Sequence, residues 1–180
     1  MRWFKFNLLN GHSMSYRRLS FWVALSIILV ASISVFLVYL RIARIPFYII
    51  DILGAQNSAI HWIGWAGALI ILATTISYSL RKRASHQSSS RLLKFHAFGN
   101  LFGFLLISVH FIHEVTRPAS NYPVLGTGIV LYSAMLLLVI TGFTTFFLIK
   151  PGWVRYYKFL HPAAAFTLLF VIIMHIIHGI

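Results

Sequence analysis

Five long apolar segments divide the chain, and clusters of charged residues set them apart. The first of them, residues 19–40, carries no charge over its whole length. Each segment reaches or exceeds the roughly 17–20 residues that a helix needs to cross about 30 Å of hydrocarbon. The pattern therefore predicts five transmembrane helices, over residues 19–42, 58–80, 92–115, 127–149 and 157–180.

The composition supports a membrane location for the whole chain, because 59% of the residues are hydrophobic and only 9% are charged. A secretory signal would have an apolar core of roughly 7–15 residues, so the longer first segment is expected to remain as a helix. The predicted fold is an all-α, integral membrane helical bundle. We divide it into a basic N-terminus (1–18), a first helix with an outer connection (19–57) and a four-helix bundle (58–180). The sequence leaves open whether the first helix packs on that bundle.

The strong positive charge follows the topology of these helices. The net charge is +13, and 12 of the 15 Lys and Arg residues precede the first helix or lie in the second and fourth connections. Under the positive-inside rule this places the N-terminus in the cytoplasm and the C-terminus outside. We therefore expect anionic membrane lipids, and no nucleic acid, as partners of the basic face. The expected location is the inner membrane of a prokaryotic cell.

The chain contains no cysteine and only two acidic residues, Asp51 and Glu114. Disulfides, thiolate metal sites, cysteine-bound iron–sulfur clusters and covalent haem attachment are therefore excluded. Carboxylate pairs and carboxylate-rich metal cages are excluded as well. Histidine is the residue type left to carry chemistry inside the membrane.

Three histidines recur with the same spacing in two of the apolar segments. The segments are "KFHAFGNLFGFLLISVHFIH" (94–113) and "KFLHPAAAFTLLFVIIMHIIH" (158–178), and in both the histidines stand at positions i, i+14 and i+17. The aligned pairs are His96 with His161, His110 with His175, and His113 with His178. Intramembrane ionisable residues are costly and usually functional, so the repeat marks a candidate site.

The i, i+14 spacing places two histidines on one face of each helix. Fourteen steps of about 100° come within about 40° of four full turns, and they span about 21 Å along the axis. The two helices are separated by one other span, so they run in the same direction and corresponding histidines lie at the same depth. Two imidazoles facing each other across a bundle can ligate a haem iron from both sides.

In this pattern the chain resembles the membrane di-haem cytochromes b, which include cytochrome b561-like proteins and the ferric-reductase-like transmembrane domain. The resemblance covers residues 58–180. It implies a four-helix bundle with two non-covalent haems b, whose irons are held by His96, His161, His110 and His175. No nucleotide-binding or flavin domain follows the bundle, so a self-contained ferric reductase is not expected.

The extra pair, His113 and His178, leaves the outer ligands undecided. These residues are candidates for contacts with haem propionates, for a quinone or metal site, or for replacing His110 and His175 as outer ligands. A pair that reaches toward the membrane surface without a ligand is the remaining alternative. Glu114, next to His113, is suited to fix its tautomer or to accept a proton.

The sequence favours transmembrane electron transfer through two bis-histidine b haems. With so little chain outside the bilayer, the expected role is that of a cytochrome subunit in an oxidoreductase complex, rather than of a stand-alone enzyme. Other redox subunits and a quinone are the expected partners. Two alternatives stay open, namely a small metal or proton transporter with a histidine relay, and a non-redox scaffold subunit.

Overall fold

The computed structural model describes residues 11–40, 59–85, 90–116, 125–147, 149 and 151–179. These residues form five long α-helices and one short 3-10 helix: α1 (Gly11–Tyr39), α2 (Ala59–Ser85), α3 (Ser90–Thr116), α4 (Leu125–Phe147), η3 (Pro151–Trp153) and α5 (Val154–Gly179). Each α-helix contains a stretch long and apolar enough to cross a membrane. The prediction of an all-α fold with five such helices is confirmed, and it indicates an integral membrane protein.

The helix ends differ from the predicted ranges where polar sequence flanks an apolar run. Helix α1 begins at Gly11 rather than at residue 19, and α2 continues to Ser85 rather than ending at residue 80. A helix satisfies its own backbone hydrogen bonds, so it extends beyond the apolar run without needing hydrocarbon around it. The last part of the predicted N-terminal segment 1–18 is therefore helical.

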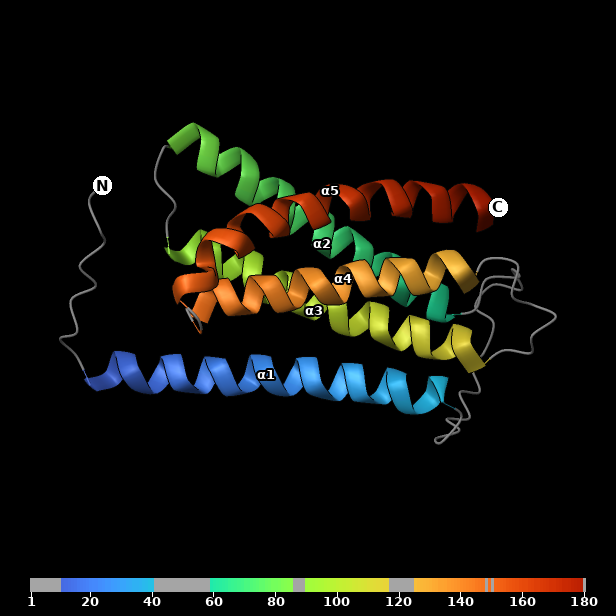
Figure 1. The fold of residues 1–180 in the computed structure, drawn as a ribbon, viewed down its shortest axis with the longest axis horizontal. Coiled ribbons are helices and arrows are strands. Elements are labelled where there is room, and N and C mark those ends of the chain that lie inside the picture. The colour runs from blue at the N-terminus through green and yellow to red at the C-terminus, as the bar shows by residue number, and fades with distance from the viewer. Residues whose placement is uncertain are drawn as a thin grey trace.

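The five helices alternate in direction along the bundle (Figure 1). Helices α1, α3 and α5 run one way, and α2 and α4 run the other way, which is the arrangement expected when short connections join consecutive helices. Helix α3 packs against α2, α1 and α4, whereas α5 packs mainly against α4. The two helices that carry the histidine repeat are therefore parallel.

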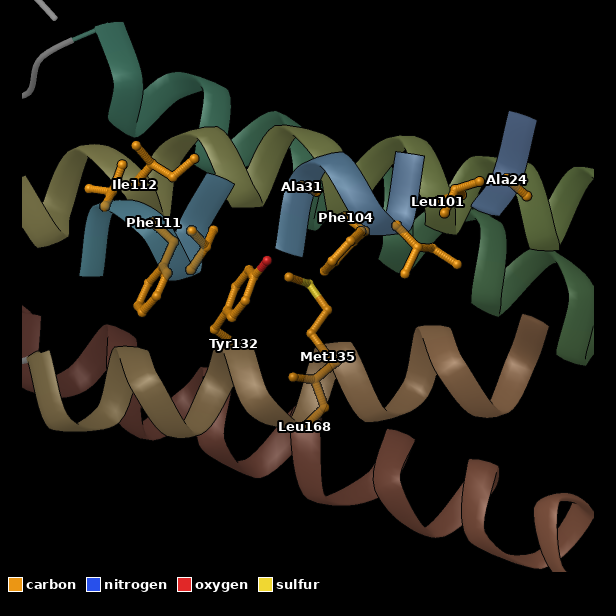
Figure 2. Close-up of a cluster of buried hydrophobic side chains, with 12 residues drawn as sticks. Ala24, Ala31, Leu101, Phe104, Phe111, Ile112, Tyr132, Met135 and Leu168 are labelled. Carbon is orange, nitrogen blue, oxygen red and sulfur yellow. The ribbon is translucent and has the colours of Figure 1, made fainter. Parts of the chain in front are cut away.

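The main apolar core lies where α1 meets α3 and α4 (Figure 2). Helix α1 contributes small and branched side chains spaced alternately by four and three positions, which is the spacing of one helix face. From α3 and α4 the core receives the fully buried Phe104 and the ring of Tyr132, which stacks on Phe111 with centroids 4.7 Å apart. The buried α1 residues are Ala24, Ile28, Ala31, Val35 and Val38. Helix α1 is therefore packed on the other helices.

Glycines bring α2 and α3 into close contact. A Cβ atom added to Gly103 would lie 2.8 Å from the carbonyl oxygen of Gly67, and one added to Gly67 would lie 2.9 Å from the carbonyl oxygen of Gly103. Small residues in such positions let membrane helices pack through their backbones. At Gly67 and Gly103 the neighbouring helix fills the space that a side chain would need.

Candidate functional site

The first histidines of the two repeats, His96 on α3 and His161 on α5, face each other. We call them the inner pair, and His110 with His175 the outer pair, after the topology that the charges predict. Their ring centroids lie 6.4 Å apart and the ring planes are at 87°. Both side chains are half-buried. Helices α3 and α5 do not pack closely on each other, yet each presents one imidazole at the same depth. The spacing of the repeat predicted this common depth.

On α4, Thr141 and Gly142 surround the ring of His161. The hydroxyl oxygen of Thr141 lies 3.0 Å from Nδ1 of His161. A Cβ atom at Gly142 would be 3.2 Å from Cε1 of the same ring, which is closer than most real contacts. The threonine therefore holds the ring through Nδ1, and the glycine leaves the room that the ring needs.

The ring of His96 lies among residues of α2 and α3. It stacks on Tyr78 with centroids 4.7 Å apart and planes at 19°. The Asn100 side-chain nitrogen is 3.2 Å from Nδ1 and 3.4 Å from Nε2 of His96. The Thr74 hydroxyl donates to the side-chain oxygen of Asn100 at 2.6 Å, and its oxygen also lies 2.8 Å from the carbonyl oxygen of Ile70. A small polar network thus supports the ring of His96 within an apolar helix contact.

The outer histidines, His110 and His175, are arranged differently. The ring of His110 contacts the ring of His61 on α2, with centroids 5.3 Å apart, and it lies beside Gly64. Nδ1 of His110 is buried and has no hydrogen-bond partner among the described residues. Nδ1 of His175 lies 2.9 Å from the hydroxyl of Thr127. The ring contact described for His110 is thus with His61 on α2.

Glu114 lies between two other histidines at the same end of the bundle. One of its carboxylate oxygens is 3.2 Å from Nδ1 of His113 and 3.5 Å from Nε2 of His61. Within the described ranges, no three His, Asp or Glu side chains are arranged to hold a metal ion by themselves. The carboxylate therefore joins two imidazoles from α2 and α3 at the outer end.

Sequence reasoning named the six repeat histidines but missed the residues that support them. Thr127, Thr141, Asn100 and Tyr78 all contact a repeat histidine. A signal for the threonines was present, since a Thr-Gly dipeptide occurs at 127–128 and again at 141–142, with the same i, i+14 spacing as the histidines. The side chain of His178 lies outside the described residues.

Comparisons of this chain with protein-family models, with curated proteins and with solved structures found no significant match. The functional argument therefore rests on the residues and on their geometry.

Proposed function

We propose that the chain is a membrane cytochrome b that carries electrons through two bis-histidine haems. The observation that carries this proposal is the separation of 6.4 Å between the ring centroids of His96 and His161. An imidazole nitrogen lies about 2 Å from a bound transition metal and about 1 Å from its own ring centre, so two imidazoles on opposite sides of one iron have centres about 6 Å apart. The inner pair therefore fits a six-coordinate haem iron.

The donor chemistry of His161 also fits a haem. Its Nδ1 is taken up by Thr141, at 3.0 Å, which leaves Nε2 as the atom that faces a ligand. Metal-bound histidines almost always use their second nitrogen in such a hydrogen bond. The hydrogen bond to Thr141 on the neighbouring helix α4 thus holds the ring, and its second nitrogen is left for a ligand.

The second haem is proposed for His110 and His175, about 21 Å further along the helices, as their i, i+14 spacing from the inner pair implies. His175 has the same threonine contact as His161. The buried Nδ1 of His110 has no partner among the described residues, and an unpaired buried polar atom costs roughly 1–3 kcal/mol. Iron bound at this nitrogen would satisfy it. His113 and His178 remain the alternative outer ligands.

Two six-coordinate haems at these positions would act as one-electron carriers and would divide the distance across the bilayer into shorter electron-transfer steps. Because two imidazoles leave no open position on the iron, the haems would pass electrons rather than bind a substrate. The chain's own residues hold the imidazole rings and fix the orientation of these rings. Donor and acceptor would then be a quinone or other redox subunits in a hetero-oligomer, with the N-terminus in the cytoplasm of a prokaryotic cell.

A histidine relay for protons or metal ions is the second candidate, and one observation favours it. Glu114 connects His61 and His113, and His61 contacts His110, so imidazoles and a carboxylate form a continuous polar set at the outer end. Such a relay requires no haem. The number of haems bound per chain therefore separates the two functions.

The proposal is tested by counting haem in purified variants. We expect His161→Ala to bind one haem per chain where the unchanged protein binds two, because the inner iron loses an axial ligand while the outer pair is intact. His86→Ala, in the polar connection between α2 and α3, is the control and should keep both haems. Full haem content in His161→Ala, or no haem in the unchanged protein from haem-replete cells, would contradict the proposal.

A further inference from the structure

Helix α4 carries the sequence Thr-Gly twice, and each copy lies against one histidine of α5. Thr127-Gly128 and Thr141-Gly142 are related by the same i, i+14 spacing as His161 and His175. Because α4 and α5 are antiparallel (Figure 1), the later threonine meets the earlier histidine. The distances are 3.0 Å from Thr141 Oγ1 to Nδ1 of His161 and 2.9 Å from Thr127 Oγ1 to Nδ1 of His175.

The other contacts of Thr141 favour one direction for its hydrogen bond with His161. A hydroxyl has one proton to donate and two lone pairs to accept with. The Thr141 hydroxyl donates to backbone carbonyls one turn back on α4, at 2.8 Å for Leu137 and 3.1 Å for Leu138. When the proton stays on one of these carbonyls, the hydroxyl oxygen accepts from His161, so that Nδ1 carries the ring proton and Nε2 presents its lone pair.

The glycine that follows each threonine lies beside the same ring. A Cβ atom at Gly142 would approach Cε1 of His161 to 3.2 Å, and one at Gly128 would approach Cε1 of His175 to 3.9 Å. Any larger residue at 142 would displace the ring from the threonine hydroxyl. At Thr141-Gly142, threonine and glycine thus act together, one by holding Nδ1 and the other by leaving space for the ring, whereas the 3.9 Å at Gly128 is an ordinary contact distance.

The histidines of α3 have no equivalent threonine support among the described residues. His96 has the Asn100 amide near both ring nitrogens, and Nδ1 of His110 has no partner within the same part of the chain. The two sides of each proposed haem therefore differ in their supporting residues, because a threonine hydroxyl of α4 contacts each α5 histidine, whereas the α3 histidines have other neighbours.

We propose that Thr141 and Thr127 are positioning residues that fix His161 and His175 as Nδ1–H tautomers, so that Nε2 is the iron ligand. The part that concerns iron rests on the proposed function, whereas the tautomer is a property of the chain itself. A hydrogen bond that holds Nδ1–H raises the basicity of the ligating nitrogen, and loss of such a partner typically lowers metal affinity about 10–100-fold.

The tautomer is tested in the haem-free protein by nitrogen NMR with ¹⁵N-labelled histidine. In the unchanged chain the signals of His161 and His175 are expected to report protonated Nδ1 and unprotonated Nε2. In Thr141→Val, which removes the hydroxyl but keeps the branched shape, the His161 signal should become a mixture of tautomers, and Thr141→Ser should restore it. An unchanged chain with His161 protonated at Nε2 would overturn the inference, whatever its haem content.

Thr144→Val is the matched control on the same helix, because the Thr144 hydroxyl donates to carbonyls of α4 itself, at 2.8 Å for Ile140 and 3.0 Å for Thr141. It should leave the His161 signal unchanged. In the haem-loaded protein, Thr141→Val should lower haem affinity about 10–100-fold and raise the midpoint potential of one haem, and Thr141→Ser should reverse both changes. Equal affinity and potential in Thr141→Val and the unchanged protein would overturn the role toward iron.

Discussion

The contact between α2 and α3 predicts a large cost for one added methyl group. In Gly103→Ala the new Cβ atom would lie 2.6 Å from Cγ1 of Ile71 and 2.8 Å from the carbonyl oxygen of Gly67. The Ile71 side chain can move, but the Gly67 oxygen belongs to the backbone of α2 and moves only with its helix. The two helices must therefore separate, and the contacts along their interface weaken together.

The expected magnitude combines two opposing effects. Overpacking of a closely packed contact costs about 1–3 kcal/mol, whereas replacing glycine by alanine inside a helix gains up to about 1 kcal/mol. Gly126→Ala on α4 is the control, because its Cβ atom would meet nothing within 4 Å. Relative to this control, we expect Gly103→Ala to lower the free energy of unfolding by about 1–3 kcal/mol.

The assay is equilibrium unfolding of both variants from mild detergent with increasing SDS, followed by circular dichroism. The difference between the two midpoints gives the cost of the added methyl group at Gly103 after the intrinsic helix preference is removed. A Gly103→Ala protein as stable as Gly126→Ala would refute the close approach of α2 and α3. No haem is needed for this test, so it examines the fold separately from the proposed function.

Two further predictions use the same bundle. Gly99→Ala should also destabilise the protein, since its Cβ atom would lie 2.5 Å from Cγ2 of Thr74. Thr74→Ser removes that methyl group, so the double variant should regain stability in a double-mutant cycle. Additive effects of the two substitutions would show that the two side chains do not touch. Because the chain has no cysteine, Gln87→Cys and Asn121→Cys each carry a single label site. In intact cells a membrane-impermeant maleimide should label residue 121 and leave residue 87 unlabelled, and the reverse pattern would invert the topology.

The sequence predicted the number of helices because the thickness of hydrocarbon sets a minimum length for each apolar run. It placed the helix ends less well, as at Gly11, because helical hydrogen bonding continues past the apolar run. It left the packing of α1 open, since this helix is apolar on every side. Only the contacts show that the face with Ala24 and Ala31 is the buried one.

The candidate site was predicted in part. Identical spacing and parallel helices predicted that His96 and His161 lie at one depth, and their rings are in contact in the structure. The outer contact of His110 with His61 was not predicted, because depth along a helix does not fix which neighbour a ring turns toward. Thr141 was missed because a single threonine in an apolar helix usually bonds only its own backbone.

The most direct test of the proposed cytochrome is the dithionite-reduced minus oxidised visible spectrum of the purified full chain, with haem quantified per chain. The proposal predicts two haems b per chain, with the spectrum of low-spin, six-coordinate iron in both oxidation states. A colourless protein from haem-replete cells would contradict it and would favour the histidine relay.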